Sequence, residues 1–389
     1  MPFIAKVQLW LVSFWINFLN FVLKIIQNIL FYKKLKNPQK ILVYKVGNIG
    51  DIVCIIPSLI AIRKNYPNAK ITFLTSPGKR GSIGAINFLK NAWYFDNIIN
   101  YYQEDINNLP KQIFFIKELK KEKFDLFIQL PDDWVRFRTL FRNIIFAKLI
   151  GVKYAFGFYL RSSWIFYKTQ IRYSPLHSNE VESNLSLLKK NGIIIDKVIF
   201  DFPFSEKEIN KVENLFNKFN FNKNDLIIAL GPGAKFFSKE WSLEKFIELS
   251  KNIIKKYNAK FIVIGGNNDI EKGKEIENKI GKYKVFNLAG NLSILETLLL
   301  FKKISFLISN DSGPVHLAAA VGLPCIALYT IRSPFGKWFP YGKNHKILYK
   351  RFLDCDYKKE ECVKKSIEMI TVNEVEKACD ELIKNIKKF

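Results

Sequence analysis

The chain has 389 residues, 49% of them hydrophobic, which excludes a mainly disordered protein and suffices for two domains with separate cores. Its 61 Lys and Arg against 35 Asp and Glu give a net charge of +26, which favours an acidic partner: nucleic acid, anionic lipid or a phosphorylated substrate. An AT-rich genome would produce the same bias toward Lys, and no aromatic-studded basic strand marks a nucleic-acid module. We therefore expect no nucleic-acid partner.

Residues 1–38 are predicted to form an amphipathic helix, because polar residues recur at steps of three or four from Ser13 onward. No uninterrupted apolar run comes near the roughly 20 residues of a membrane span. Trp10 and Trp15, followed by a lysine-rich stretch, suit an anionic lipid surface. We expect peripheral attachment to the cytoplasmic face of the inner membrane; a signal-anchor span and a helix packed on the protein itself are the alternatives.

Residues 39–203 are expected to form a first α/β domain. Strand signals occur at 41–46, 70–75 and 126–130, and a helical pattern covers 52–64. The strands are almost entirely apolar, which is typical of a parallel sheet covered by helices on both faces.

Residues 204–372 are expected to form a second α/β domain with the same alternation of strands and helices. Residues 373–389 are predicted to form a C-terminal helix. Strand signals occur at 226–230, 260–264, 304–308 and 324–329, with helices over 242–255 and 315–321. Two such domains place a ligand site at the carboxyl ends of the strands, where α/β proteins bind ligands.

The turn after the first strand, Gly47-Asn48-Ile49-Gly50-Asp51, carries a candidate catalytic carboxylate. It lacks the third glycine of a dinucleotide loop, so a nicotinamide cofactor is not expected. Asp51 suits a helix N-terminus for electrostatic reasons alone. It could equally accept a proton from a substrate hydroxyl.

Two turns of the second domain suit a diphosphate. Gly231, Gly233 and Ala234 precede Lys239, so backbone N–H groups and an ammonium follow one strand. The stretch 309–316 opens a helix whose N-terminus favours an anion. Its candidate ligand-binding residues are Asp311, Ser312, Gly313 and His316.

Arginine is rare in this Lys-dominated chain, so its clusters are candidate anion sites. Arg80, Arg136 and Arg138 are assigned to an anionic acceptor, since guanidinium groups bind phosphate and carboxylate in a bidentate manner. A solvated basic helix face is the alternative.

Cysteine and histidine usage argues against disulfides and metal sites. The five cysteines form no CxxC pair, which fits a reducing cytoplasm. The three histidines are scattered without paired ligand spacing, so zinc is not expected. The segment 354–356 matches the Asp-x-Asp pattern of metal-dependent sugar transferases, but no strong strand precedes it.

The ordered motifs together resemble glycosyltransferase family 9, the heptosyltransferases of the lipopolysaccharide inner core. The resemblance spans roughly residues 40–385. It rests on Gly50-Asp51 with Pro57, Lys239-x-Trp241 with Phe246, Gly265-Gly266, the stretch from Ser309 to Pro324, Trp338-x-Pro340-x-Gly342, and Cys362, Ile370 and Val375.

The resemblance implies a GT-B fold, two Rossmann-like domains with parallel sheets, and an inverting transfer that needs neither metal nor cofactor. Asp51 would be the general base on the acceptor hydroxyl, and Lys239 would stabilise the departing diphosphate. The donor, with ADP-heptose expected, would be bound by Gly231, Gly233, Ala234, Lys239, Gly266, Asp311, Ser312, Gly313 and His316. The acceptor would be a phosphorylated, lipid-linked oligosaccharide.

Two departures from the family affect the expected function. Lys45 stands where the family often has Arg, which weakens an expected phosphate contact, and the extension of about 38 residues implies firmer membrane association. Three alternatives remain open: a UDP-hexose or UDP-N-acetylhexosamine donor, a catalytically idle GT-B scaffold at the membrane, and a nucleotide-sugar epimerase of similar fold.

Overall fold

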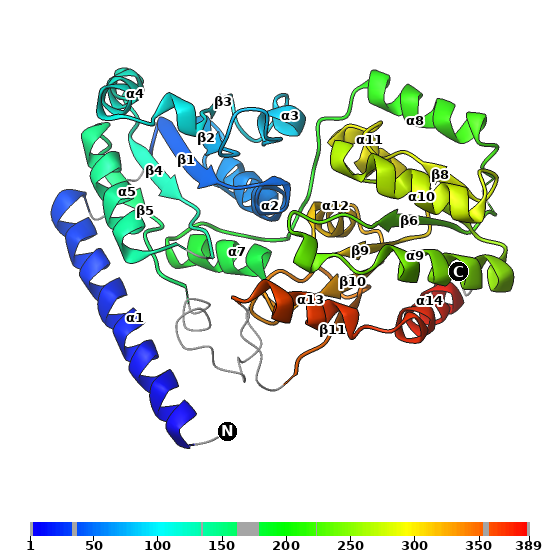
Figure 1. Ribbon diagram of the computed structural model, residues 1–389. Helices are drawn as coiled ribbons and strands as arrows, with labels where there is room; N and C mark the ends of the chain where they lie inside the picture. The colour runs from blue at the N-terminus through cyan, green and yellow to red at the C-terminus, as the bar shows by residue number, and fades with distance from the viewer. Residues whose placement is uncertain are drawn as a thin grey trace. The chain divides into compact units, whose positions relative to one another are not determined.

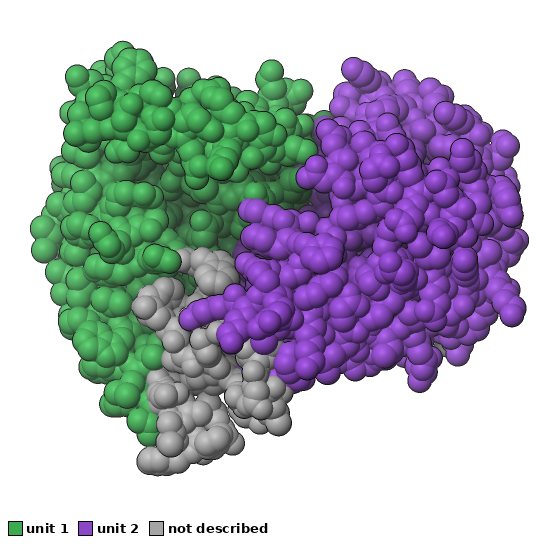
Figure 2. Space-filling view, in the orientation of Figure 1, with its two compact units in different colours: residues 1–203 green, residues 204–389 purple. Residues whose placement is uncertain are grey.

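A computed structural model describes residues 3–32, 37–133, 135–161, 179–222, 224–352 and 358–386. The chain divides into two compact units, Met1–Pro203 and Phe204–Phe389 (Figure 2).

The first unit is built on a five-stranded parallel sheet in the order β3-β2-β1-β4-β5 (Figure 1). Its strands are β1 (Lys40–Val46), β2 (Lys70–Ser76), β3 (Asn97–Asn100), β4 (Leu126–Gln129) and β5 (Tyr154–Phe156). Its longer helices are α1 (Phe3–Leu30), α2 (Ile49–Asn65), α4 (Leu109–Lys121), α5 (Phe137–Leu149) and α7 (Glu180–Lys190), with the short α3 (Ile86–Leu89) and η1 (Gln103–Asp105). Because the strand order reverses between β1 and β4, the switch point of this Rossmann-like unit lies at the ends of those two strands.

The second unit contains a six-stranded parallel sheet in the order β11-β10-β9-β6-β7-β8. Its strands are β6 (Ile227–Gly231), β7 (Lys260–Val263), β8 (Val285–Asn287), β9 (Phe306–Asn310), β10 (Cys325–Tyr329) and β11 (Lys346–Tyr349). Its helices are α8 (Glu206–Lys218), α9 (Leu243–Tyr257), α10 (Ile270–Ile280), α11 (Ile294–Phe301), α12 (Gly313–Ala320), α13 (Glu360–Glu368) and α14 (Val372–Ile386), with the short η2 (Phe237–Lys239) and η3 (Asn267–Asp269). Here the order reverses between β6 and β9, which places this unit's switch point at Gly231 and Asn310.

Apolar strand sequences account for both sheets. Every residue of β4, β6, β9 and β10 is buried, as expected for strands covered by helices on both faces. Several predicted boundaries were off by one to three residues, and two of these shifts bear on the site. The strand expected at 304–308 lies at Phe306–Asn310, and the helix expected from residue 52 begins at Ile49, which puts Asp51 in its first turn.

The N-terminal helix α1 packs on the first unit along one side. Ile16, Leu23 and Phe31 are buried in that unit's core. The Asn20 amide donates to the Leu160 carbonyl at 3.0 Å and accepts from the Leu160 N–H at 2.8 Å. Within the described residues, α1 is also the one helix whose length and composition, over Trp10–Leu30, would suffice to cross a membrane.

Candidate functional site

The loop after β1 holds Asp51 close to the switch point of the first unit. Asp51 is the third residue of α2, and its Oδ2 accepts a hydrogen bond from the Asn48 N–H at 2.9 Å. A Cβ at Gly47 would lie only 2.4 Å from the Asp51 Cβ. Glycine at position 47 therefore allows the carboxylate to fold back over the helix N-terminus.

A buried ionic network lies beside this loop. Lys45, at 1% exposure, places its Nζ 2.7 Å from Asp132 Oδ1 and 3.7 Å from Glu180 Oε1. Arg161 pairs with the other Glu180 oxygen and donates to Asn184 at 2.7 Å. Lys45 is thus paired internally, with the buried Glu180 and with Asp132, whose side chain is 42% exposed.

Burial, modified by these charges, sets the pKa of Asp51. Burial raises the pKa of Asp51 to about 6, with Lys45 opposing the rise and Asp132 adding to it. A carboxyl with this pKa is mostly ionised at pH 7 and is more basic than an ordinary aspartate. That combination is the one a general base requires near neutral pH.

The second unit pairs two of the predicted donor-site residues. Lys239, at the end of η2, places its Nζ 2.5 Å from Asp311 Oδ2, directly after β9. The side chains are 14% and 6% exposed, so both charges are largely removed from water. Asn310 joins the same loops by donating to the Pro232 carbonyl at 2.7 Å and accepting from the Trp241 N–H at 3.0 Å.

Close packing at the ends of β6 and β7 explains two of the predicted glycines. A Cβ at Gly231 would meet Ser309 Oγ at 2.4 Å, and one at Gly233 would meet Asp269 Oδ1 at 2.0 Å. Gly266 differs, because a Cβ there would point into open space. Its N–H donates to Asp269 at 3.0 Å, so this backbone donor is already satisfied.

The start of α12 presents the remaining predicted residues. Ser312 turns its hydroxyl back to the Asn310 carbonyl at 3.1 Å, leaving the first turn from Gly313 without a side-chain cap. His316 is buried one turn further, with its ring edge-on to Trp338 at 6.0 Å between centroids.

The arginines assigned to an acceptor lie in different settings. Arg80 pairs with Asp105 and stacks on Tyr102, 5.1 Å from the ring centre. Arg136 is the exposed residue before α5, and Arg138 lies exposed within its first turn. The Asp-x-Asp alternative at 354–356 lies outside the described residues.

Sequence reasoning missed several groups that support these sites. Glu240 accepts from the Ala234 N–H at 3.1 Å and from Lys272 at 2.6 Å, which holds the donor-site loop against α10. Glu240 could have been noticed between Lys239 and Trp241. Lys272 is harder to identify, because its local partner Asp269, at 3.2 Å, gives an ordinary i,i+3 pair and its other partner, Glu240, comes from a distant loop.

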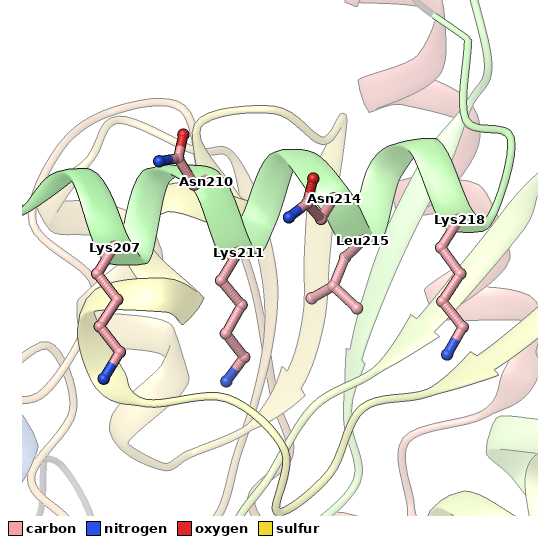
Figure 3. A pocket seen from close by; sticks show the side chains of 6 residues that line it. All are labelled: Lys207, Asn210, Lys211, Asn214, Leu215 and Lys218. Carbon is pink, nitrogen blue, oxygen red and sulfur yellow. The ribbon is translucent and has the colours of Figure 1, made fainter.

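An open groove runs along α8, and none of the predicted site residues lines it. It is lined by Lys207, Asn210, Lys211, Asn214, Leu215 and Lys218 (Figure 3). Lys211 is held by Glu296 at 2.8 Å, so one of these lysines is already paired.

Comparison with known proteins gives a family and a fold. The family described as "Glycosyltransferase family 9 (heptosyltransferase)" matches residues 113–368, about two thirds of the chain. The lipopolysaccharide core heptosyltransferase OpsX of Haemophilus influenzae is 22% identical over 304 residues, covering 76% of this chain and 80% of that protein. Lipopolysaccharide heptosyltransferase 3 of Escherichia coli K12 is 26% identical over 313 residues, covering 76% and 83%.

Solved structures resemble the chain over most of its length. A glycosyl transferase family 9 structure from Veillonella parvula has a TM-score of 0.72 at 20% identity, covering 90% of this chain and 99% of that one. The E. coli ADP-heptose heptosyltransferase II structure has a TM-score of 0.64 at 20% identity, with the same coverage. The expected GT-B fold is confirmed.

Proposed function

This chain belongs to glycosyltransferase family 9, and we propose that it moves a heptose from ADP-heptose to a lipopolysaccharide or lipooligosaccharide core. The observation that carries the proposal is the Lys239–Asp311 pair at the switch point of the second unit, inside the matched region. The relatives that cover three quarters of the chain support heptose as the sugar.

In this proposal the second unit holds the donor. Lys239 supplies a positive charge for the diphosphate, and the N-terminus of α12 supplies the positive end of a helix dipole. The loops at the same sheet edge contain Gly231, Gly233, Ala234 and Gly266. The start of α12 carries Ser312, Gly313 and His316. Asp311 accepts hydrogen bonds from hydroxyl groups of the donor while it stays paired with Lys239.

The first unit supplies the base. Asp51 takes the proton of the acceptor hydroxyl while that oxygen forms a bond to the anomeric carbon and the nucleoside diphosphate leaves with the bonding electrons. The pKa of about 6 supports this role. Inversion follows from a single displacement, and no metal is assigned because Lys239 and the helix N-terminus neutralise the leaving group. Arg80, Arg136 and Arg138 stay candidates for phosphate groups of the acceptor.

The acceptor's lipid places the reaction at the cytoplasmic face of the inner membrane. The exposed apolar side of α1 supports peripheral attachment there.

A donor assay tests the sugar and the nucleotide. Purified protein with a core oligosaccharide acceptor is expected to release ADP from ADP-heptose and to extend the acceptor by one heptose. Preference for a UDP-hexose would contradict the heptose assignment, and isomerisation of the sugar without acceptor would indicate an epimerase. Binding of nucleotide without transfer from any donor would indicate an idle scaffold.

Replacing Lys239 with Met is expected to lower kcat by about 10²- to 10³-fold, because the leaving diphosphate loses its cation in a site shielded from water. Single-turnover kinetics with ADP-heptose would measure the effect, and Lys239→Arg should recover part of it. The matched control is Lys245→Met, which also removes a paired lysine of the second unit (2.9 Å from Glu368) and should leave turnover unchanged. Equal losses in Lys239→Met and Lys245→Met would contradict the assignment.

A further inference from the structure

Helix α1 has two apolar sides, and only one of them is covered. Its inner side buries Ile16 and Leu23 in the core of the first unit. Its outer side exposes Trp10, Phe14, Phe18, Phe21, Ile25 and Ile29, which recur every three or four residues and therefore form one stripe. Trp10 and Ile29 are 66% and 75% exposed. Large apolar stripes of this kind mark interaction sites in soluble domains.

The inner side is attached by more than hydrophobic contact. The two hydrogen bonds between Asn20 and Leu160 fix the middle of the helix, and the Tyr32 N–H donates to the Lys153 carbonyl at 3.0 Å. Lys148 of α5 donates to the Leu30 carbonyl at 2.9 Å. The orientation of the outer stripe is therefore set by the fold of the first unit.

The exposed apolar surface continues on two neighbouring helices. α5 packs beside α1, and α4 packs beside α5 (Figure 1). All three turn their inner sides into the same core cluster, through Leu23, Ile144 and Leu119 respectively. Their outer sides expose further large apolar residues, namely Phe141, Ile145 and Leu149 on α5 and Leu109, Ile113 and Phe114 on α4.

The same three helices are strongly basic. Two Lys or Arg lie on α1, three on α5 and four on α4, whereas Glu118 is the single acidic residue among them. Arg138, Arg142 and Lys148 lie exposed among the apolar residues of α5. Exposed aromatic and aliphatic residues flanked by cations, with almost no acid, match the chemistry of an anionic lipid interface.

We propose that α1, α5 and α4 form a single membrane-binding face of the first unit, with α1 lying in the plane of an anionic bilayer. This inference rests on the proposed membrane location and states how the chain is held there. A span over Trp10–Leu30 would place the charged Lys24 inside the hydrocarbon region, where charges are costly. It would also break both Asn20 hydrogen bonds and uncover Ile16 and Leu23. Lying in the plane keeps every one of these contacts and buries only the outer stripe.

Flotation of the full-length protein with lipid vesicles tests the face. We expect binding to phosphatidylethanolamine vesicles containing phosphatidylglycerol, much weaker binding to phosphatidylcholine vesicles, and weakening by salt. Two variants test the two helices: Phe14→Ser/Phe18→Ser/Phe21→Ser on α1, and Phe141→Ser/Leu149→Ser on α5. Each variant should lower the partition coefficient at least about tenfold, since each removes apolar area from the interface. The matched control is Ile194→Ser/Tyr283→Ser, which removes two even more exposed residues elsewhere (72% and 76%) and should bind as the wild type does.

Three outcomes would overturn the inference. Unchanged binding of the α5 variant would limit the contact to α1, and resistance of bound protein to alkaline carbonate would indicate a span. A third outcome is that the wild type does not bind vesicles but forms concentration-dependent dimers, which the α1 and α5 substitutions dissociate. It would show that a second copy of the chain covers the face. Turnover on a delipidated oligosaccharide reports separately on the proposed transferase activity, and the face variants should retain it.

Discussion

Replacing Asp51 with Asn is expected to lower kcat by about 10²- to 10⁴-fold, the usual contribution of a positioned general base. Asparagine keeps an oxygen that can accept from the Asn48 N–H, so the start of α2 should stay intact. What disappears is the ability to take a proton. Steady-state kinetics with ADP-heptose and a core acceptor would measure the loss, and donor affinity should change little.

The pH profile identifies the group responsible. Since the pKa of Asp51 is raised to about 6, activity of the wild type should rise with pH through a midpoint near 6. Its folded pKa exceeds the ordinary value of 3.8, so ionisation of this carboxyl lowers stability as pH rises through that range. Asp51→Asn should therefore melt no earlier than the wild type at pH 7, which separates lost chemistry from lost folding.

A matched control exists in the second unit. Glu208 is likewise the third residue of its helix, α8, and accepts from the backbone N–H of the preceding cap residue, Ser205, at 2.8 Å. Glu208→Gln should leave turnover and its pH dependence unchanged. If Asp51→Asn behaved like Glu208→Gln, the carboxylate would be only a helix cap.

Replacing Lys45 with Met is expected to destabilise the first unit by about 1–3 kcal/mol, because the buried Glu180 would keep only Arg161 and the half-exposed Asp132 would lose its partner. Burial lowers the pKa of Lys45, but these two carboxylates raise it more, so the pKa lies above its usual 10.5. The stabilisation is thus complete at neutral pH and is lost only above about pH 10.5. Denaturant unfolding at pH 7, followed by a probe in the first unit, would measure it.

Two comparisons make this result specific. Lys245→Met breaks a more exposed pair and should cost no more than about 1 kcal/mol. Lys45→Met/Asp132→Asn should recover part of the lost stability, since one unpaired charge is removed. Lys45 also lowers the pKa of Asp51, so any folded Lys45→Met protein should show its rise in activity at higher pH. A loss below about 1 kcal/mol in Lys45→Met would contradict the network.

The position of Gly231 and Asp311 at one sheet edge could be predicted from the sequence, because each lies next to a strand in the chain. Gly231 ends β6 and Asp311 follows β9, and parallel strands bring such positions to one sheet edge. Local patterns also identified the apolar strands, although not the two-residue shift of β9. Family resemblance then supplied roles that charge and spacing alone left open.

The ionic network around Asp51 could not be predicted in the same way. Glu180 and Arg161 are 19 residues apart and meet Lys45 from more than 100 residues away. Nothing in their local sequence distinguishes them from solvated charges. Only the packing of α7 against α2 creates the buried space in which such pairing becomes obligatory.

The Asn20–Leu160 contact makes α1 a part of the folded first unit rather than an appendage. A shortened chain starting near residue 39, designed to improve solubility, would expose the core that Ile16 and Leu23 cover. It would also leave the Leu160 N–H and carbonyl without their side-chain partner. Helix α1 looks like a membrane anchor that could be removed. It is nevertheless part of the folded core of the domain that carries the proposed base, Asp51.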